Sequence, residues 1–189
     1  NLYIYLFHFD IISVFYVLPE AKTLFRNDTK WNPYIIIGGD VPVKITANLS
    51  TPGTLGELAL QQVEYLKDVN ELTISGVMNE TDMALLKNNF PDLISLNMKN
   101  TNITDIPNSH FQYRYYLRNV ILPDSLQTMG TYVFYQCYDL QEIEIPKKVK
   151  VINDYAFHDC NQLKKVSFPT TLTHIKYSAF GSNYQLTDL

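Results

Sequence analysis

A period of 23 residues dominates the second half of this chain and constrains its fold more than any other feature. Proline, phenylalanine, leucine and isoleucine or methionine each recur at this interval. The recurring positions are Pro123, Pro146 and Pro169; Phe134, Phe157 and Phe180; Leu140, Leu163 and Leu186; and Met129, Ile152 and Ile175. Steps of 23 and then 24 residues extend the pattern back through Leu117 and Leu93 to Val69. A unit this short cannot bury its apolar face alone, so neighbouring units must stack into a solenoid.

Each unit predicts a short strand, a polar turn and a compact apolar segment. In the unit that begins at Leu140, alternation at period two before a proline predicts a strand with Ile143 and Ile145 facing inward. Further along, the motif Ala-Phe-x-x-Cys predicts about one helical turn, with Phe157 and Cys160 on one face. Stacked units would therefore place a short parallel β-sheet on one face and short helices or turns on the other.

A resemblance to the leucine-rich repeats of the BspA-like class, also found in treponemal repeat proteins, is carried by the stretch LPDSLQTMGTYVFYQCYDLQEIEIPKKVKVINDYAFHDCNQLKKVSFPTTLTHIKYSAF. Residues 107–189 follow the pattern of that class, except that Val133 replaces an alanine and Asn183 replaces a cysteine. The resemblance implies an α/β leucine-rich-repeat solenoid. It also implies a secreted or surface-attached bacterial protein that binds other macromolecules, and it implies no catalytic residues.

Residues 51–106 are similar to the less regular, helix-bearing repeats that precede the regular ones in such proteins. Thr54 and Glu57 have the spacing of a capping box at the start of a helix. The predicted elements are a helix at 54–67, a strand at 71–75, a helix at 81–89 and a strand at 94–98.

Two interpretations stay open for the N-terminal extension, residues 1–50. The nearly continuous apolar run at residues 2–18 is either a secretory signal or anchor, or strands that cap the solenoid. Asp10 argues against a membrane span, because a carboxylate at its centre would cost about 2.5–3.5 kcal/mol. Residues 34–46 predict a hairpin, or two strands around a Gly-Gly turn.

The repeat pattern stops within a unit, at Leu189, where a strand should begin. Solenoids need a polar cap at each end, and the sequence shows none here. We therefore expect either a fragment of a longer chain or a last strand edge that pairs with a partner, with self-association through the C-terminal coil as one form of that pairing.

Charge and cysteine number exclude several functional classes. The chain has 15 Lys and Arg against 19 Asp and Glu, a net charge of −4, which argues against binding to nucleic acid. Two cysteines cannot build a disulfide framework or a four-thiolate zinc site. Cys137 and Cys160 share one repeat position, so buried packing explains them better than a redox pair, although a disulfide between adjacent coils is sterically open.

Catalytic and metal-binding motifs are missing from the sequence. The four histidines have no metal-ligand spacing, and no nucleophile motif or phosphate loop occurs. His158, Asp159 and Cys160 are adjacent, and we expect them to point in different directions rather than form a catalytic trio. The sequence therefore predicts neither an enzyme nor a cofactor or metal site.

The outward positions of the predicted strands form the main candidate binding surface. If Ile143 and Ile145 face the core, their alternate neighbours face solvent and line the sheet. The predicted members are Asn119, Ile121, Glu142, Glu144, Lys165 and Ser167, continued in earlier coils by Thr73, Ser75, Ser95 and Asn97. The strip is mixed in charge, so it favours neither nucleic acid nor membrane.

A second candidate is the aromatic and basic cluster at residues 111–118. Phe111 and Leu117 are core positions of the repeat, whereas the residues between them are not required by the core. Tyrosine and arginine are enriched among the residues that dominate binding energy. The candidate anchors are Tyr113, Arg114, Tyr115, Tyr116 and Arg118. The alternative is that these tyrosines are half-buried against adjoining coils.

Together these features predict a non-enzymatic extracellular recognition or adhesion module, secreted or at the cell surface. The expected partner is a protein or glycan on another cell or in the matrix, bound through the strand-lined face. Contact with a membrane is expected only through the N-terminal signal or anchor. The alternatives are a structural spacer, a self-associating repeat domain, or an accessory domain of a larger protein.

Overall fold

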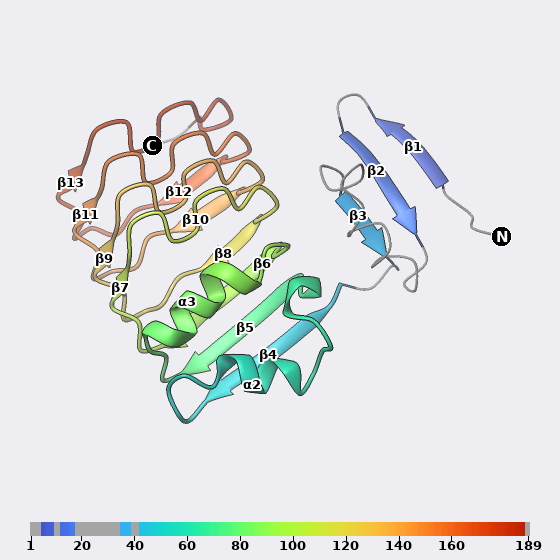
Figure 1. Ribbon diagram of the computed structural model, residues 1–189. Helices are drawn as coiled ribbons and strands as arrows, with labels where there is room; N and C mark the ends of the chain where they lie inside the picture. The colour runs from blue at the N-terminus through green and yellow to red at the C-terminus, as the bar shows by residue number, and fades with distance from the viewer. Residues whose placement is uncertain (1–4, 10–11, 18–34, 39–41, 188–189) are drawn as a thin grey trace. The chain divides into compact units, whose positions relative to one another are not determined.

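The computed structural model describes residues 5–9, 12–17, 35–38 and 42–187 of the chain (Figure 1). The chain divides into two compact units, Asn1–Pro42 and Val43–Leu189.

The first unit contains a three-stranded sheet. Strand β1 (Tyr5–Phe9) pairs antiparallel with β2 (Ile12–Val17), and β3 (Ile35–Gly38) pairs parallel with β2. Two of these strands lie within the apolar run at 2–18, and the rest of that run lies outside the described residues. Of the two interpretations of 34–46, the hairpin is wrong, because β3 belongs to this sheet while the next strand along the chain belongs to the sheet of the second unit. Two strands do form in this stretch, and residues 39–41 between them lie outside the described residues.

The second unit is a solenoid built on a six-stranded sheet in which every pair of neighbours is parallel. Its strands, in order across the sheet, are β4 (Lys44–Leu49), β5 (Glu71–Gly76), β6 (Ser95–Thr101), β8 (Asn119–Ile121), β10 (Glu142–Glu144) and β12 (Lys165–Ser167). Ile143 is buried between the exposed Glu142 and Glu144, and Ile145 is buried too. The predicted sheet and the direction of its isoleucines are therefore confirmed.

Short strands form a second side of the regular coils, seen at the left of Figure 1. They are β7 (Asp105–Ile106), which pairs with β9 (Thr128–Met129), and β11 (Val151–Ile152), which pairs with β13 (His174–Ile175). In each coil, a turn segment leads from the short strand to the next strand of the large sheet. Each regular coil therefore contributes one strand to the large sheet, one short strand to the second side and one turn segment, in separate stretches of chain.

The turn segments are not helical, which corrects the prediction of one helical turn. Tyr132 and Gln136 have φ of 59° and 57°, in the left-handed region that a right-handed helix does not use. The equivalent residues of the other coils are also left-handed: Ser109, Tyr113, Tyr155, Asp159, Ser178 and Ser182. With this backbone, amides donate to the next coil instead of within a helix, as in Phe134 N to Ala156 O at 2.8 Å.

A column of phenylalanines fills the core beneath these turns. Phe111, Phe134, Phe157 and Phe180 stack with successive ring centroids 5.2 Å apart and nearly parallel planes. Parallel strand pairing sets neighbouring coils about 4.8 Å apart, so rings at the same repeat position must meet face to face. Phe157 and Cys160 are both buried, as predicted, although they do not lie on a helix.

The earlier coils carry helices instead of tight turns. These are α2 (Leu55–Leu60), the 3-10 turn η2 (Leu66–Asp68) and α3 (Glu80–Asn89). The predicted second helix is confirmed, whereas the first is shorter than predicted and ends at Leu60. Leu55 and Ala59 are fully buried, and Val63 and Leu66 of the predicted apolar stripe still pack against the core although they lie beyond the end of α2.

The predicted capping box of α2 is replaced by a carboxylate from α3. The Thr54 hydroxyl donates to the Thr51 carbonyl and makes no cap. Instead, Asp82 accepts from Leu55 N at 2.9 Å and from Gly53 N at 2.7 Å. The same carboxylate also completes a capping box with Asn79 at the start of α3, so one buried side chain begins both helices.

Candidate binding surfaces

The parallel register aligns the outward-facing residues of the six strands into two rows, which together we call the strand-lined face. One row consists of Lys44, Glu71, Ser95, Asn119, Glu142 and Lys165, each registered with the next. The other consists of Thr46, Thr73, Asn97 and Ile121, followed by the registered pair Glu144 and Ser167. The rows cross the sheet perpendicular to its strands.

The structure brings the predicted residues of this face together on the solvent side. Those of the later coils are exposed: Asn119, Ile121, Glu142, Glu144, Lys165 and Ser167. The predicted residues of the earlier coils are half-buried: Thr73, Ser75, Ser95 and Asn97. Ile121 is 48% exposed and is an apolar side chain among polar ones. Opposite charges stand at both ends of the first row. Lys44 Nζ lies 2.8 Å from Glu71 Oε2 at one end, and Glu142 is registered beside Lys165 at the other.

Arg114, predicted as a binding anchor, is instead an internal structural residue. Its side chain is turned inward and the residue is only 9% exposed. The guanidinium donates to the carbonyl of Leu86 at 3.0 Å and also to the carbonyls of Lys87 and Phe90. The last carbonyls of a helix have no partner within the helix, and a cation there is favourable for the helix dipole. Arg114 therefore closes the C-terminal end of α3 and is not available to a partner.

Arg114 also begins a column of polar donors that repeats every 23 residues. The same position holds Cys137, Cys160 and Asn183 in the following coils. The Cys137 thiol donates to the Phe111 carbonyl at 3.1 Å and the Cys160 thiol donates to the Phe134 carbonyl at 3.2 Å.

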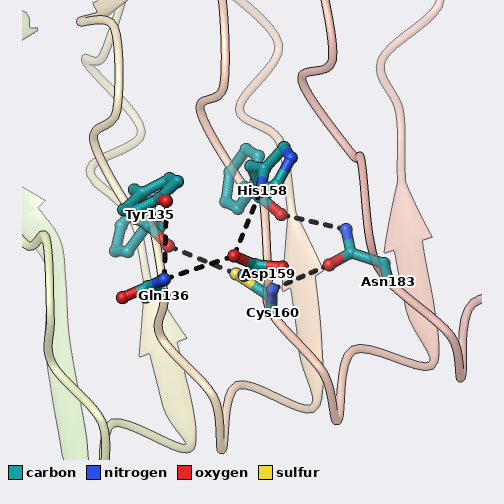
Figure 2. A network of polar contacts seen from close by, with 8 residues as sticks. Tyr135, Gln136, His158, Asp159, Cys160 and Asn183 are labelled. Carbon is teal, nitrogen blue, oxygen red and sulfur yellow. Dashed lines mark hydrogen bonds and ion pairs between the residues drawn. The ribbon is translucent and has the colours of Figure 1, made fainter.

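Asn183 continues this column in place of the expected cysteine. Its amide donates to the Phe157 carbonyl at 2.9 Å, and its oxygen accepts from Cys160 N at 2.8 Å (Figure 2). Arginine, cysteine and asparagine thus have the same role at this position: each donates a hydrogen bond to a backbone carbonyl of the preceding coil.

The two cysteines are free and buried, so the disulfide alternative is wrong and the packing interpretation is confirmed. Burial raises the pKa of Cys137 well above its usual range and that of Cys160 to about 12. Both groups therefore remain protonated thiols at neutral pH, as their hydrogen bonds to carbonyls require.

The tyrosines extend into a larger aromatic surface than the sequence indicated. Same-position rings of adjacent coils stack, with centroids 5.2 Å apart for Tyr115 and Tyr138 and 5.0 Å apart for Tyr132 and Tyr155. Further ring contacts connect these pairs through Tyr113, Tyr135 and His158. We call these seven residues the tyrosine surface. The 23-residue spacing of Tyr115 and Tyr138, and of Tyr132 and Tyr155, was the signal that could have revealed it.

The other predicted anchors lie at or near this surface. Tyr113 and Tyr115 are exposed, whereas Tyr116 is half-buried, as the alternative interpretation expected for these tyrosines. Arg118 is exposed, and its guanidinium lies 3.8 Å from the Asp139 carboxylate. Burial raises the pKa of Asp139, and the charge of Arg118 opposes that shift.

Figure 2 shows the polar contacts around His158. His158 Nδ1 lies 3.4 Å from Asp159 Oδ2, so these neighbours do meet, contrary to the expectation that they point apart. Gln136 also donates to the Asp159 carboxylate, at 3.3 Å. Cys160 is turned into the core, however, and its thiol is engaged with a carbonyl. The three residues do not form a catalytic arrangement.

The described part of the chain has neither a metal-ligand cluster nor a membrane-spanning helix. Among those residues, no group of three or more His, Cys, Asp or Glu side chains could hold a metal ion. Within the same part, no helix combines the length and the apolar character that crossing a membrane requires.

These coils, with one parallel strand, a short second strand and a turn in each, define a leucine-rich-repeat solenoid. Residues 84–189 match the family described as BspA type leucine rich repeat region, in 6 copies. The chain belongs to this family, whose repeat domains are generally protein-interaction modules and typically not enzymes. A search of the curated proteins finds no match.

Three solved structures are similar to the chain. A leucine-rich repeat protein from Bacteroides ovatus is 19% identical, with a TM-score of 0.49 over 77% of this chain and 36% of that one. The Treponema pallidum leucine-rich repeat protein is 13% identical, with a TM-score of 0.48 over 98% and 88%. A leucine-rich cell surface protein from Faecalibacterium prausnitzii is 13% identical, with a TM-score of 0.48 over 99% and 53%. The chain therefore spans about a third of the Bacteroides protein.

Proposed function

We propose that the chain is an extracellular recognition module that binds a protein or glycan of another cell or of the matrix through the strand-lined face. The observation that carries this proposal is the register of six parallel strands, which presents two continuous rows of outward-facing side chains. Five interstrand spacings of about 4.8 Å make this face about 24 Å wide. A surface of that width can contact a folded partner.

The composition of the face supports recognition. Its centre contains the exposed Ile121, and charged residues lie toward both ends of the row that runs from Lys44 to Lys165. Protein interfaces commonly have an apolar centre inside a polar rim. Because the residues sit on a hydrogen-bonded sheet, little conformational entropy would be lost on binding.

Membership of the BspA-type family supports a secreted or cell-surface location. Release from the cell or attachment to it would involve segments such as the apolar run at 2–18, which is the one part of the chain predicted to contact a membrane. The net charge of −4 supports a partner other than nucleic acid.

The test is a binding screen of the purified chain against extracellular-matrix proteins and a glycan array. A variant with Glu142, Glu144 and Lys165 changed to alanine is screened in parallel. We expect at least one ligand, with binding lost in this variant because the substitutions remove the charged end of the face.

A matched control carries the same net change in charge elsewhere, with the exposed residues Glu57, Asp124 and Lys148 changed to alanine. This control should bind like the unchanged chain. Equal loss in both variants, or binding kept in both, would contradict recognition by the strand-lined face. A screen with no ligand would instead favour a spacer or scaffold, and sedimentation of the chain at several concentrations would then test self-association.

A further inference from the structure

We propose that the tyrosine surface is a second binding site, and that it takes a basic polypeptide segment containing arginine or lysine. This surface lies on the turn segments, which are a different stretch of each coil from the strands of the large sheet. The inference therefore stands apart from the proposed function of the strand-lined face.

The rings of this surface are not needed to fill the core. The phenylalanine column already occupies the interior of the same turns, with Phe111, Phe134 and Phe157 essentially inaccessible to solvent. The tyrosines form a second layer outside it, in which Tyr113 is 50% exposed and Tyr115 is 42% exposed. Contiguous exposed aromatic groups of this kind mark interaction sites more often than isolated ones do.

The rings are ordered before any partner arrives. Each one contacts at least one other ring, with centroids between 5.0 and 6.1 Å apart. Tyrosine has few rotatable bonds, and stacking restrains those further, so binding would cost little side-chain entropy. Aromatic residues held in this way are typical of the residues that dominate binding energy.

Carboxylates among the rings indicate the charge of the partner. Asp159 contacts His158 at the centre of the surface, and Asp139 lies beside Arg118 at its margin. Asp154 accepts from the amide of Tyr177, next to the ring of Tyr155. Two main effects raise the pKa of Tyr135: first the desolvation of its hydroxyl group, and second the negative charge of Asp159. Three carboxylates thus stand near the rings against the one guanidinium of Arg118, and phenolic oxygens and carboxylates both accept hydrogen bonds from guanidinium and ammonium groups.

Ring orientation favours a polypeptide over a glycan. Sugars stack on open aromatic faces, but Tyr115 lies against Tyr138 with planes 15° apart, and Tyr132 lies against Tyr155 with planes 8° apart. Each stacked pair covers one face of both its rings, which reduces the open aromatic area on which a sugar could stack. The phenolic hydroxyl groups can still accept hydrogen bonds from donors that carry positive charge.

The test measures binding of three probes to the full chain at physiological salt: a synthetic Arg-Gly repeat peptide, its Glu-Gly counterpart and a neutral glucan oligosaccharide. We expect only the Arg-Gly peptide to bind. Its affinity should fall about tenfold or more in the double variant Tyr115→Ser/Tyr138→Ser, which removes one stacked pair. The double variant Asp139→Asn/Asp159→Asn should lose a similar factor, because it removes the acceptors with negative charge.

Two matched controls distinguish a site from general attraction to an acidic protein. Tyr65→Ser removes an exposed tyrosine outside the turn segments, and Glu57→Gln/Asp124→Asn removes two negative charges outside both candidate surfaces. Both should change the affinity by less than about twofold. An equal loss in the controls would overturn the proposal, as would binding of the glucan with the same dependence on Tyr115 and Tyr138.

A measurement on the unchanged chain avoids any effect of the substitutions on folding. Tyrosines are nitrated with tetranitromethane with and without the Arg-Gly peptide, and the modified positions are found by mass spectrometry. Tyr115 and Tyr138 should be protected by the peptide, while Tyr65 should not. If the peptide left the nitration of Tyr115 and Tyr138 unchanged, the proposal would be overturned.

Discussion

The coils at 43–106 and those at 107–187 are connected to their neighbours by different kinds of contact. In the first region, single polar side chains connect one coil to the next across 22 to 29 residues. In the second, backbone amides of each turn segment donate to the next coil, and same-position rings stack. Tight coils are therefore held to their neighbours by contacts that recur in every coil, whereas coils with long connections are held by individual polar side chains.

In the first region, two asparagines and an aspartate make hydrogen bonds between neighbouring coils. Asn70 accepts from Val43 N at 3.2 Å and donates to Asp92 O at 3.3 Å. Asn102 accepts from Met78 N at 2.7 Å and donates to its carbonyl at 3.2 Å. Asp82 begins two helices. Each of these residues is unique in its coil, so losing one should have a local effect that repetition cannot compensate.

The largest effect should come from the phenylalanine column. Phe134→Ala removes a ring stacked on both Phe111 and Phe157, and cavities of this kind cost about 3–5 kcal/mol. Urea unfolding followed by circular dichroism should show this loss. It should also show an earlier transition for the regular coils, because each coil contacts only its neighbours. A loss below about 1 kcal/mol would mean that the column does not hold these coils together.

Asp82→Ala should destabilise the first region by about 3 kcal/mol. The residue is 1% exposed, and its removal leaves the buried amide of Leu55 and the amide of Gly53 without their acceptor. Thermal unfolding of this variant is compared with that of Glu80→Gln, which changes an exposed neighbour in the same helical turn. Equal melting temperatures for the two variants would contradict the capping role.

His110 should make the junction between the two regions sensitive to acid. Burial, followed by the positive charges of Lys87 and Arg114, lowers its pKa from 6.5 to about 4. The unfolded chain therefore binds a proton more readily than the folded chain between these values. The stability contributed by neutral His110 is fully present above pH 6.5 and is lost as the pH falls through 4, up to about 3 kcal/mol.

The test replaces His110 with valine, the residue found at the equivalent position 133. The His110→Val chain should lose less stability than the unchanged chain between pH 6.5 and pH 4, measured by urea unfolding at each pH. His174→Gln, a change at an exposed histidine, serves as the control and should leave the pH profile unchanged. Identical profiles for His110→Val and the unchanged chain would show that the histidine does not couple to folding.

The smallest effect concerns the polar column. Asn183→Cys should cost about 1 kcal/mol, because Cys160 N loses its acceptor while a thiol can still donate to the Phe157 carbonyl as the cysteines of earlier coils do. Asn183→Val should cost about 1 kcal/mol more, because it leaves that carbonyl unpaired as well. Equal stability of the two variants would contradict a shared donor role along the column.

Repetition made much of the fold and of the strand-lined face predictable. The period placed Ile143 inward and Glu142 outward correctly, because a strand permits only two directions. It could not show that Asp82 caps a helix 27 residues away, since that contact depends on how two unlike coils pack.

The structural role of Arg114 was missed for another reason. Arg114 shares its repeat position with Cys137, and this spacing was present in the sequence, but an arginine and a cysteine do not look equivalent until their hydrogen bonds are seen. The left-handed turns were equally hidden, because serine, tyrosine, glutamine and aspartate occupy positions where glycine would have been the usual signal.

Recognition through the strand-lined face is tested most directly by carboxyl labelling of the unchanged chain with and without a ligand from the screen. Carbodiimide-activated carboxylates are coupled to an amine, and mass spectrometry measures the extent of modification at each position. We predict that the ligand lowers modification of Glu142 and Glu144 several-fold while Glu57 and Asp124 keep theirs. Unchanged modification of Glu142 and Glu144 with ligand bound would contradict the account.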